Sequence, residues 1–114
     1  MGTPTAKSIV LVPFSFSDLS QTKLRPALVL AETDRGDCIL CQITSNPYGD
    51  SRAIALTNNQ LAAGSLHKIS YARPSKLFTA NHNLMQKEIG SLTADAFKQV
   101  IEGVINILRS STTQ

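Results

Sequence analysis

The chain has 114 residues, of which 42% are hydrophobic and 17% are charged. A chain of this size and composition buries roughly two-thirds of its unfolded surface, which excludes a disordered protein. No apolar run approaches the ~20 residues that a membrane-spanning helix needs. The formal net charge of +3 permits a polyanionic partner without requiring one.

Short apolar stretches alternate with polar turns through most of the chain, which is typical of a series of strands. The stretch from Ile9 to Phe14 is almost continuously apolar and predicts a strand covered on both faces, with an edge or a bulge at Pro13. Pro26 suits the first position of a second strand, where a missing backbone donor is tolerated. The expected strands cover residues 9–14, 27–31, 38–43, 52–56, 69–72 and 76–79.

Turn-forming residues separate these strands. A polar loop is expected over residues 15–23, a hairpin turn over 32–37 and a further loop over 44–51. Residues 57–64 are predicted to hold one helical turn that stops at Gly64.

Residues 94–109 carry the clearest periodicity and predict an amphipathic helix. Thr93 is a good N-cap, Asp95 complements the positive end of a helix, and Gly103 costs about 1 kcal/mol relative to alanine. The apolar positions at helical spacing are Phe97, Val100, Ile101, Val104, Ile105 and Leu108. Short strands followed by such a helix predict a mainly β, α+β fold, a small barrel with the helix packed against it.

Both ends of the chain are polar. We expect one domain over residues 1–114, with flexible ends at 1–7 and 110–114. The N-terminal segment contains no apolar stretch, which argues against a secretory signal and favours a cytoplasmic protein.

Cys38 and Cys41 have the C-x-x-C spacing of metal and redox sites. The flanking residues predict a buried strand, however, and residues three apart on a strand point to opposite faces. Two such thiols cannot share an ion or form an unstrained disulfide, and a zinc site needs two more ligands. We therefore expect two small buried side chains in a reducing compartment, and no metal.

Common catalytic motifs are missing from the sequence, which has no phosphate-binding glycine loop, no nucleophile elbow and no H-E-x-x-H. His67 and His82 lie in polar surroundings and are expected at the surface. Arg25 precedes a proline that holds it extended, and Thr44 with Ser45 ends a later strand, so a cation and two hydroxyls could converge on a phosphate. On spacing alone, a surface arginine and a threonine that caps a turn are the favoured interpretation.

Several stretches of the sequence, taken in order, resemble the PemK/MazF family of toxins. The most specific are Lys23–Leu30, with its Arg-Pro-Ala-Leu-Val-Leu run, and Ile39–Ser45, which ends in Ile-Thr-Ser. The other stretches that carry the resemblance are residues 9–14, 16–20, 64–66, 70–79 and 89–92.

The resemblance implies an SH3-like small barrel, usually a homodimer, that is the toxin of a type II toxin–antitoxin pair. It also implies metal-independent cleavage of single-stranded RNA, often messenger RNA, without a cofactor, and neutralisation by a cognate antitoxin protein. Such a toxin meets DNA only indirectly, through the antitoxin complex, and has no membrane partner. The family's catalytic arginine falls on Arg25, its catalytic threonine on Thr44, and a neighbouring serine on Ser45.

Cleavage without a metal uses the 2′-hydroxyl of the RNA as the nucleophile and leaves a 2′,3′-cyclic phosphate and a 5′-hydroxyl. Arg25 can stabilise the negative phosphorane with two charge-assisted donors, and Thr44 can add a hydroxyl bond. The sequence shows no obvious general base for this step. The candidates for RNA binding are Lys23, Ser45, Arg73 and Lys76.

Two departures from the family pattern bear on these expectations. Lys7-Ser8 stands where the family usually has Gly-Asp, and residues 70–74 contain no acid to accompany Arg73. Two alternatives therefore stay open. One is a non-catalytic SH3-like module that binds antitoxin or nucleic acid, and the other is a gyrase-directed toxin of the same fold.

Overall fold

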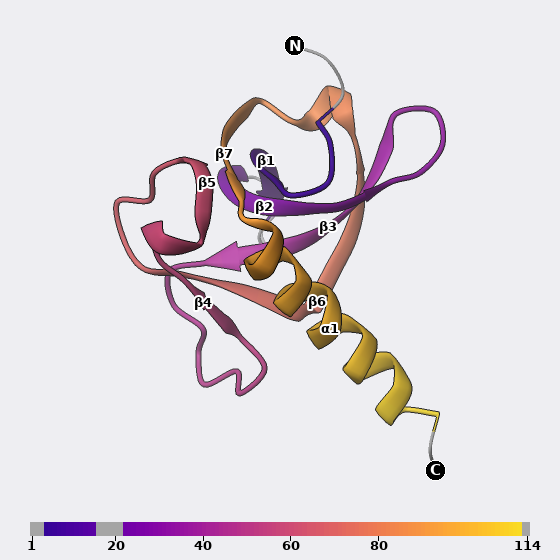
Figure 1. Cartoon of the computed structure of the whole chain (residues 1–114). Helices are drawn as coiled ribbons and strands as arrows, with labels where there is room; N and C mark the ends of the chain where they lie inside the picture. The colour runs from indigo at the N-terminus through magenta and orange to yellow at the C-terminus, as the bar shows by residue number, and fades with distance from the viewer. Residues whose placement is uncertain (1–3, 16–21, 113–114) are drawn as a thin grey trace.

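In the computed structural model, which describes residues 4–15 and 22–112, seven strands form one sheet that curls into a nearly closed barrel, and helix α1 lies across it (Figure 1). Neighbouring strands follow the order β4-β6-β3-β2-β1-β7-β5, with every pairing antiparallel. The strands are β1 Ser8–Ser15, β2 Thr22–Glu32, β3 Asp37–Thr44, β4 Ile54–Leu56, β5 Leu61–Gly64, β6 Ser70–Asn81 and β7 Lys87–Leu92. The helices are α1 Ala94–Ser110 and two 3₁₀ turns, Asn58–Gln60 and His82–Leu84.

The predicted mainly β barrel with an amphipathic C-terminal helix is confirmed, but strand β6 differs from the prediction. The two short strands expected around Arg73 and Pro74 are one strand of 12 residues. Its pairing with β3 passes from Cys41 opposite Leu77 to Ile43 opposite Ala72, so residues 73–76 bulge out of the ladder. Because Pro74 lies in this bulge, its missing N–H removes no ladder hydrogen bond.

Two other segments also depart from the sequence-based expectation. The helical turn predicted over residues 57–64 shrinks to Asn58–Gln60, and Gly64 ends strand β5 rather than a helix. Strand β7 was not expected, because its lysine, glutamate and glycine have low strand propensity. It forms because β1 and β5 pair with it from both sides. Residues 16–21 of the predicted loop over 15–23 lie outside the described residues.

Two hydrophobic clusters cover the two faces of the sheet. Ile9 belongs to one cluster and Val10 and Val12 to the other, which confirms that β1 is covered on both faces. Cys41 lies in the first cluster and Cys38 in the second, so the two thiols point to opposite faces as predicted. Both are buried and neither is in a disulfide.

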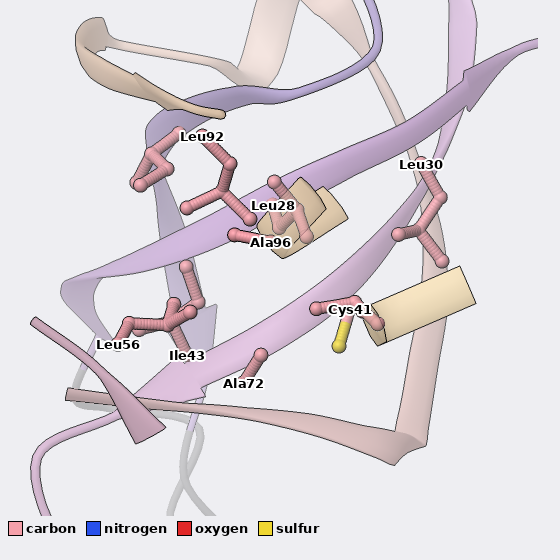
Figure 2. Packing of buried hydrophobic residues seen from close by; sticks show 10 residues of the cluster. Leu28, Leu30, Cys41, Ile43, Leu56, Ala72, Leu92 and Ala96 are labelled. Atoms are coloured by element: carbon pink, nitrogen blue, oxygen red, sulfur yellow. The ribbon is translucent and has the colours of Figure 1, made fainter. Parts of the chain in front are cut away.

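The first cluster joins the sheet to helix α1. Figure 2 shows Leu28 from β2, Cys41 from β3 and Ala72 from β6 gathered around the same space as Ala96 of α1. Val100, one turn further along the helix, is also fully buried. The helix therefore covers the open side of the barrel and completes its core.

Helix α1 begins and packs as its sequence dictates. The Thr93 hydroxyl accepts a hydrogen bond from the Ala96 N–H at 3.2 Å, which confirms the predicted N-cap. Gly103 faces strand β6, and a Cβ at this position would lie 3.0 Å from Pro74 Cγ. The glycine lets the helix approach the strand closely, which accounts for a residue of low helix propensity in mid-helix.

Residues 4–7 are held against the barrel, where the sequence predicts a flexible end. Pro4 is buried, and the Lys7 N–H donates to the Val29 carbonyl at 3.0 Å. The Lys7 carbonyl accepts from the Leu92 N–H at 2.9 Å. These bonds fix the entry to β1 between β2 and β7. No helix within the described ranges is long and apolar enough to cross a membrane.

Candidate functional site

The start of β2 and the end of β3 meet at one pocket of about 270 Å³. The β2–β3 ladder ends at Ala27 opposite Gln42, and Arg25 and Thr44 each lie two residues beyond that pair and line the pocket. Two residues 19 apart in sequence therefore face the same space. The lining residues are Lys23, Leu24, Arg25, Pro26, Ile43, Thr44, Ser45, His67, Lys68 and Ser70.

Thr44 lines this pocket, and its hydroxyl bonds to the turn that follows β3. The side chain is buried, and its Oγ1 accepts from the Asn46 N–H at 3.2 Å and lies 3.1 Å from the Asn46 carbonyl, to which it can donate. Thr44 thus caps the turn after β3, as the plainer interpretation of the sequence expects. The bond from Asn46 also fixes the oxygen, so the hydroxyl proton can turn from the carbonyl toward a ligand.

Positive charge dominates the pocket. Lys23 and Arg25 line it from β2 and Lys68 from the loop before β6, and none of the described lining residues is an aspartate or a glutamate. Pro26 keeps Arg25 in extended backbone, as the sequence predicts. Three cations around a small pocket, together with hydroxyl-bearing residues in its lining, suit a phosphate-bearing ligand chemically.

His67 and Lys68 are among the polar lining residues that sequence reasoning missed. His67 is exposed, as expected, but it is exposed to this pocket rather than to a featureless surface. Both residues belong to the segment between β5 and β6, more than 20 residues along the chain from Thr44. No periodicity encodes the path of such a loop, so the sequence carried no signal for their position.

The structure places Arg73 and Lys76, two of the predicted RNA-binding residues, outside the pocket lining. Lys76 is exposed on β6. The Arg73 guanidinium donates through Nε to Oδ2 of Asp50 at 2.8 Å. That hydrogen bond is the main cause of a pKa of the Asp50 carboxyl below the ordinary value, and the Arg52 N–H contributes further. The carboxylate that accompanies Arg73 is therefore Asp50, from the loop before β4, and not a residue of the stretch 70–74.

The thiols of the C-x-x-C pair serve the core rather than this pocket. Burial raises the pKa of the Cys41 thiol to about 12, and its Sγ donates to the Arg73 carbonyl at 3.1 Å. Burial likewise raises the pKa of Cys38. Within residues 4–15 and 22–112, no three histidine, cysteine, aspartate or glutamate side chains gather in a way that could hold a metal ion.

A small antiparallel barrel with a cationic pocket at the β2–β3 edge defines a known class of protein. The chain matches the model of the PemK-like, MazF-like toxins of type II toxin–antitoxin systems over residues 6–108. It belongs to this family, as the resemblance in its sequence predicted. No curated protein sequence matches the chain significantly.

Solved structures of related toxins share the fold. The MazE–MazF complex of Deinococcus radiodurans (form II) superposes with a TM-score of 0.76 at 19% identity, over 95% of this chain and 97% of that chain. An endoribonuclease in complex with its cognate antitoxin, from a mycobacterial species, gives 0.70 at 12% identity over 95% of each chain. The Mycobacterium tuberculosis toxin MazF-mt6 gives 0.65 at 17% identity, over 88% of this chain and 96% of that chain. At sequence identities this low, the structural similarity establishes that the chain has the barrel fold.

Proposed function

We propose that this toxin is an endoribonuclease that cleaves single-stranded RNA, including messenger RNA, in the pocket between β2 and β3. The observation that supports the proposal is that Arg25 and Thr44 line one pocket together with Lys23 and Lys68. A phosphodiester entering this pocket meets a guanidinium, two ammonium groups and a hydroxyl. None of the described lining residues is a carboxylate of the kind that binds Mg²⁺ or Ca²⁺, which favours cleavage without a metal.

In the reaction that we propose, the 2′-oxygen of the RNA attacks the adjacent phosphorus and the bond to the 5′-oxygen breaks. The products are a 2′,3′-cyclic phosphate and a 5′-hydroxyl. The intermediate phosphorane carries more negative charge than the ground state, so donors aimed at its oxygens accelerate the reaction. Arg25 supplies two charge-assisted donors and Thr44 supplies its hydroxyl.

We assign the RNA contacts next to the scissile phosphate to Lys23, Ser45 and Lys68, which all line the pocket. Lys68 is not among the residues that the sequence predicts. Lys76 and Arg73 lie outside the lining and are assigned to RNA that extends beyond the pocket. Arg73 would make that contact while bonded to Asp50. Each lysine contact to a phosphate releases counterions, so binding weakens as salt rises.

We infer further that a cognate antitoxin protein neutralises the toxin, because solved relatives of the same fold are toxin–antitoxin complexes. The toxin acts in the cytoplasm as a homodimer, and it meets DNA only through the antitoxin complex. Sedimentation of the purified toxin at micromolar concentration tests the dimer, and a monomer there would contradict it.

The decisive experiment incubates purified toxin with single-stranded RNA in excess EDTA and analyses the termini of the fragments. We expect cyclic-phosphate and 5′-hydroxyl ends from the wild type, and a rate at least about 100-fold lower from Arg25→Ala. RNA with a 2′-deoxy substitution at the cleaved position should stay intact. A folded wild-type protein that leaves RNA uncut would contradict the nuclease. DNA breaks through gyrase would then indicate the gyrase-directed alternative, and inactivity in both assays the non-catalytic module.

A further inference from the structure

The cleavage proposed above lacks one component, a group that accepts the proton of the attacking 2′-hydroxyl. Arg25 and the two lysines of the pocket are cations and have no free lone pair for it. The hydroxyls of Thr44 and Ser45 are far too weak as bases at neutral pH. The question is therefore which lining side chain can take up a proton.

We propose that His67 is this proton acceptor, an inference that rests on the nuclease function. His67 lines the same 270 Å³ pocket as Arg25 and Thr44. Its side chain is exposed, so a substrate in the pocket can reach it. Imidazole is the side chain that ordinarily exchanges a proton between pH 5 and 8. Every other described lining residue is a cation, an alcohol or an apolar side chain.

The loop that carries His67 is held on both sides of it. The Leu66 N–H donates to Oδ1 of Asn58 at 2.8 Å. Past His67, the Ser70 hydroxyl donates to the Lys68 carbonyl at 3.3 Å. These bonds fix the backbone before and after the imidazole, as acid–base chemistry requires of a group that must stay within hydrogen-bond reach of its proton.

The step balances without any further reactant. The 2′-oxygen forms its bond to phosphorus and its proton passes to a ring nitrogen of His67. The bond from phosphorus to the 5′-oxygen then breaks, and that oxygen takes a proton from solvent water. The imidazolium returns its proton to solvent, so no net proton is gained or lost.

The charged side chains among the described lining residues, other than His67 itself, are all cations. Lys23 and Arg25 face the pocket from β2, Lys68 is the next residue on its own loop, and β3 contributes only the uncharged Thr44 and Ser45. Within residues 4–15 and 22–112, no carboxylate lines the pocket. The neutral form of the imidazole is the one that a general base requires.

The test compares the pH dependence of kcat/KM between pH 5 and 8.5 for wild type, His67→Gln and the matched control His82→Gln, all in EDTA. In the wild type the rate should rise about tenfold per pH unit at the acidic end and then level. His67→Gln should lose about 100-fold or more in rate and lose this bend, whereas His82→Gln should keep it. Added imidazole should partly restore cleavage by His67→Gly.

Binding separates this role from a structural one. We expect His67→Gln to bind a 2′-deoxy oligonucleotide within a few-fold of the wild type and to unfold at the same temperature. If His67→Gln cleaves RNA with the same pH dependence of kcat/KM as the wild type, the role of His67 is wrong but the proposed nuclease activity is not contradicted. The role of His67 is also wrong if His67→Gln is slow but keeps the acidic fall in kcat/KM, and imidazole does not restore cleavage by His67→Gly. An inactive wild type removes the nuclease and the inference together.

Discussion

The Nε of Arg73 donates to Oδ2 of Asp50 at 2.8 Å, and this ion pair joins strand β6 to the segment between β3 and β4. Both side chains are largely buried, at 18% and 11% exposure. Oδ1 of the same carboxylate accepts from the Arg52 N–H at 2.9 Å. The pair therefore closes the loop that starts at Thr44 and Ser45, although Arg73 does not line the pocket.

Asp50→Asn should destabilise the protein by about 1 kcal/mol at neutral pH, because the amide cannot form the ion pair. The pKa of Asp50 is lowered in the folded protein, so its contribution is fully present above the pKa of an unfolded aspartate. That contribution is lost as the pH falls toward the folded pKa. Urea unfolding of both proteins at pH 7, 5, 4 and 3 should show a gap that narrows with acid. A gap that stays constant would contradict this role.

Thr44→Val should slow RNA cleavage about 100-fold, because it removes one donor to the phosphorane. It should also cost about 1 kcal/mol of stability, because the bond from the Asn46 N–H is lost. Thr44→Ser keeps the hydroxyl and is the matched control. We expect it to retain most of the cleavage rate and most of the stability. Cleavage rates and urea midpoints measure the two effects. Equal rates for the valine and serine variants would mean that the hydroxyl takes no part.

Lys68→Gln should weaken the salt dependence of RNA binding, with a slope of log K against log salt smaller by about 0.7. Lys76 is an equally exposed lysine that lies outside the pocket lining, which makes Lys76→Gln the control. Fluorescence titrations of a non-cleavable trinucleotide at several salt concentrations give the slopes. On so short a ligand Lys76→Gln should keep the wild-type slope. If Lys76→Gln reduces the slope as much as Lys68→Gln does, the short RNA also contacts strand β6.

Gly64→Ala should destabilise the barrel far more than Gly49→Ala. Both glycines have positive φ, +81° and +75°, so alanine is strained at either position. A Cβ on Gly64 would also run into the Ile89 carbonyl of the neighbouring strand, whereas nothing lies within 4 Å of one on Gly49. We expect Gly64→Ala to lose about 1–3 kcal/mol more in urea unfolding. Similar losses of unfolding free energy for the two variants would show that strand β7 can shift to make room for the Cβ at position 64.

Both cysteines should resist thiol reagents in the native protein. With the pKa of Cys41 near 12, only about one thiol in ten thousand is ionised at pH 8, and the sulfur is buried. Iodoacetamide at pH 8 should label neither Cys38 nor Cys41 in an hour, and both in guanidinium. Rapid labelling of the native protein, or a disulfide in it, would revive a redox role for the C-x-x-C pair.

Much of the fold could be predicted because local patterns and tertiary packing agree. The helix periodicity after Thr93 and the apolar run from Ile9 both form the predicted elements. Prediction failed where tertiary pairing decides, as in β7, or where a bulge absorbs a proline, as at Pro74. Neither effect is visible in a window of neighbouring residues.

The candidate site could be predicted only in part. Arg25 and Thr44 are predicted because their motifs resemble a family, and both line one pocket just beyond the end of the β2–β3 ladder. His67 reaches the same pocket along an irregular loop, and Asp50 meets Arg73 across 23 residues of chain. Contacts of this kind depend on how the chain returns to itself, which spacing and propensity do not encode.

The pocket is assembled from one hairpin and one later loop, and this order matters during synthesis. A nascent chain folds from its N-terminus as it leaves the ribosome. The β2–β3 hairpin can present Arg25 and Thr44 early, but His67 and Lys68 join only when β6 has emerged and paired with β3. A truncated translation product that ends before His67 therefore lacks part of the pocket lining, although it contains both Arg25 and Thr44.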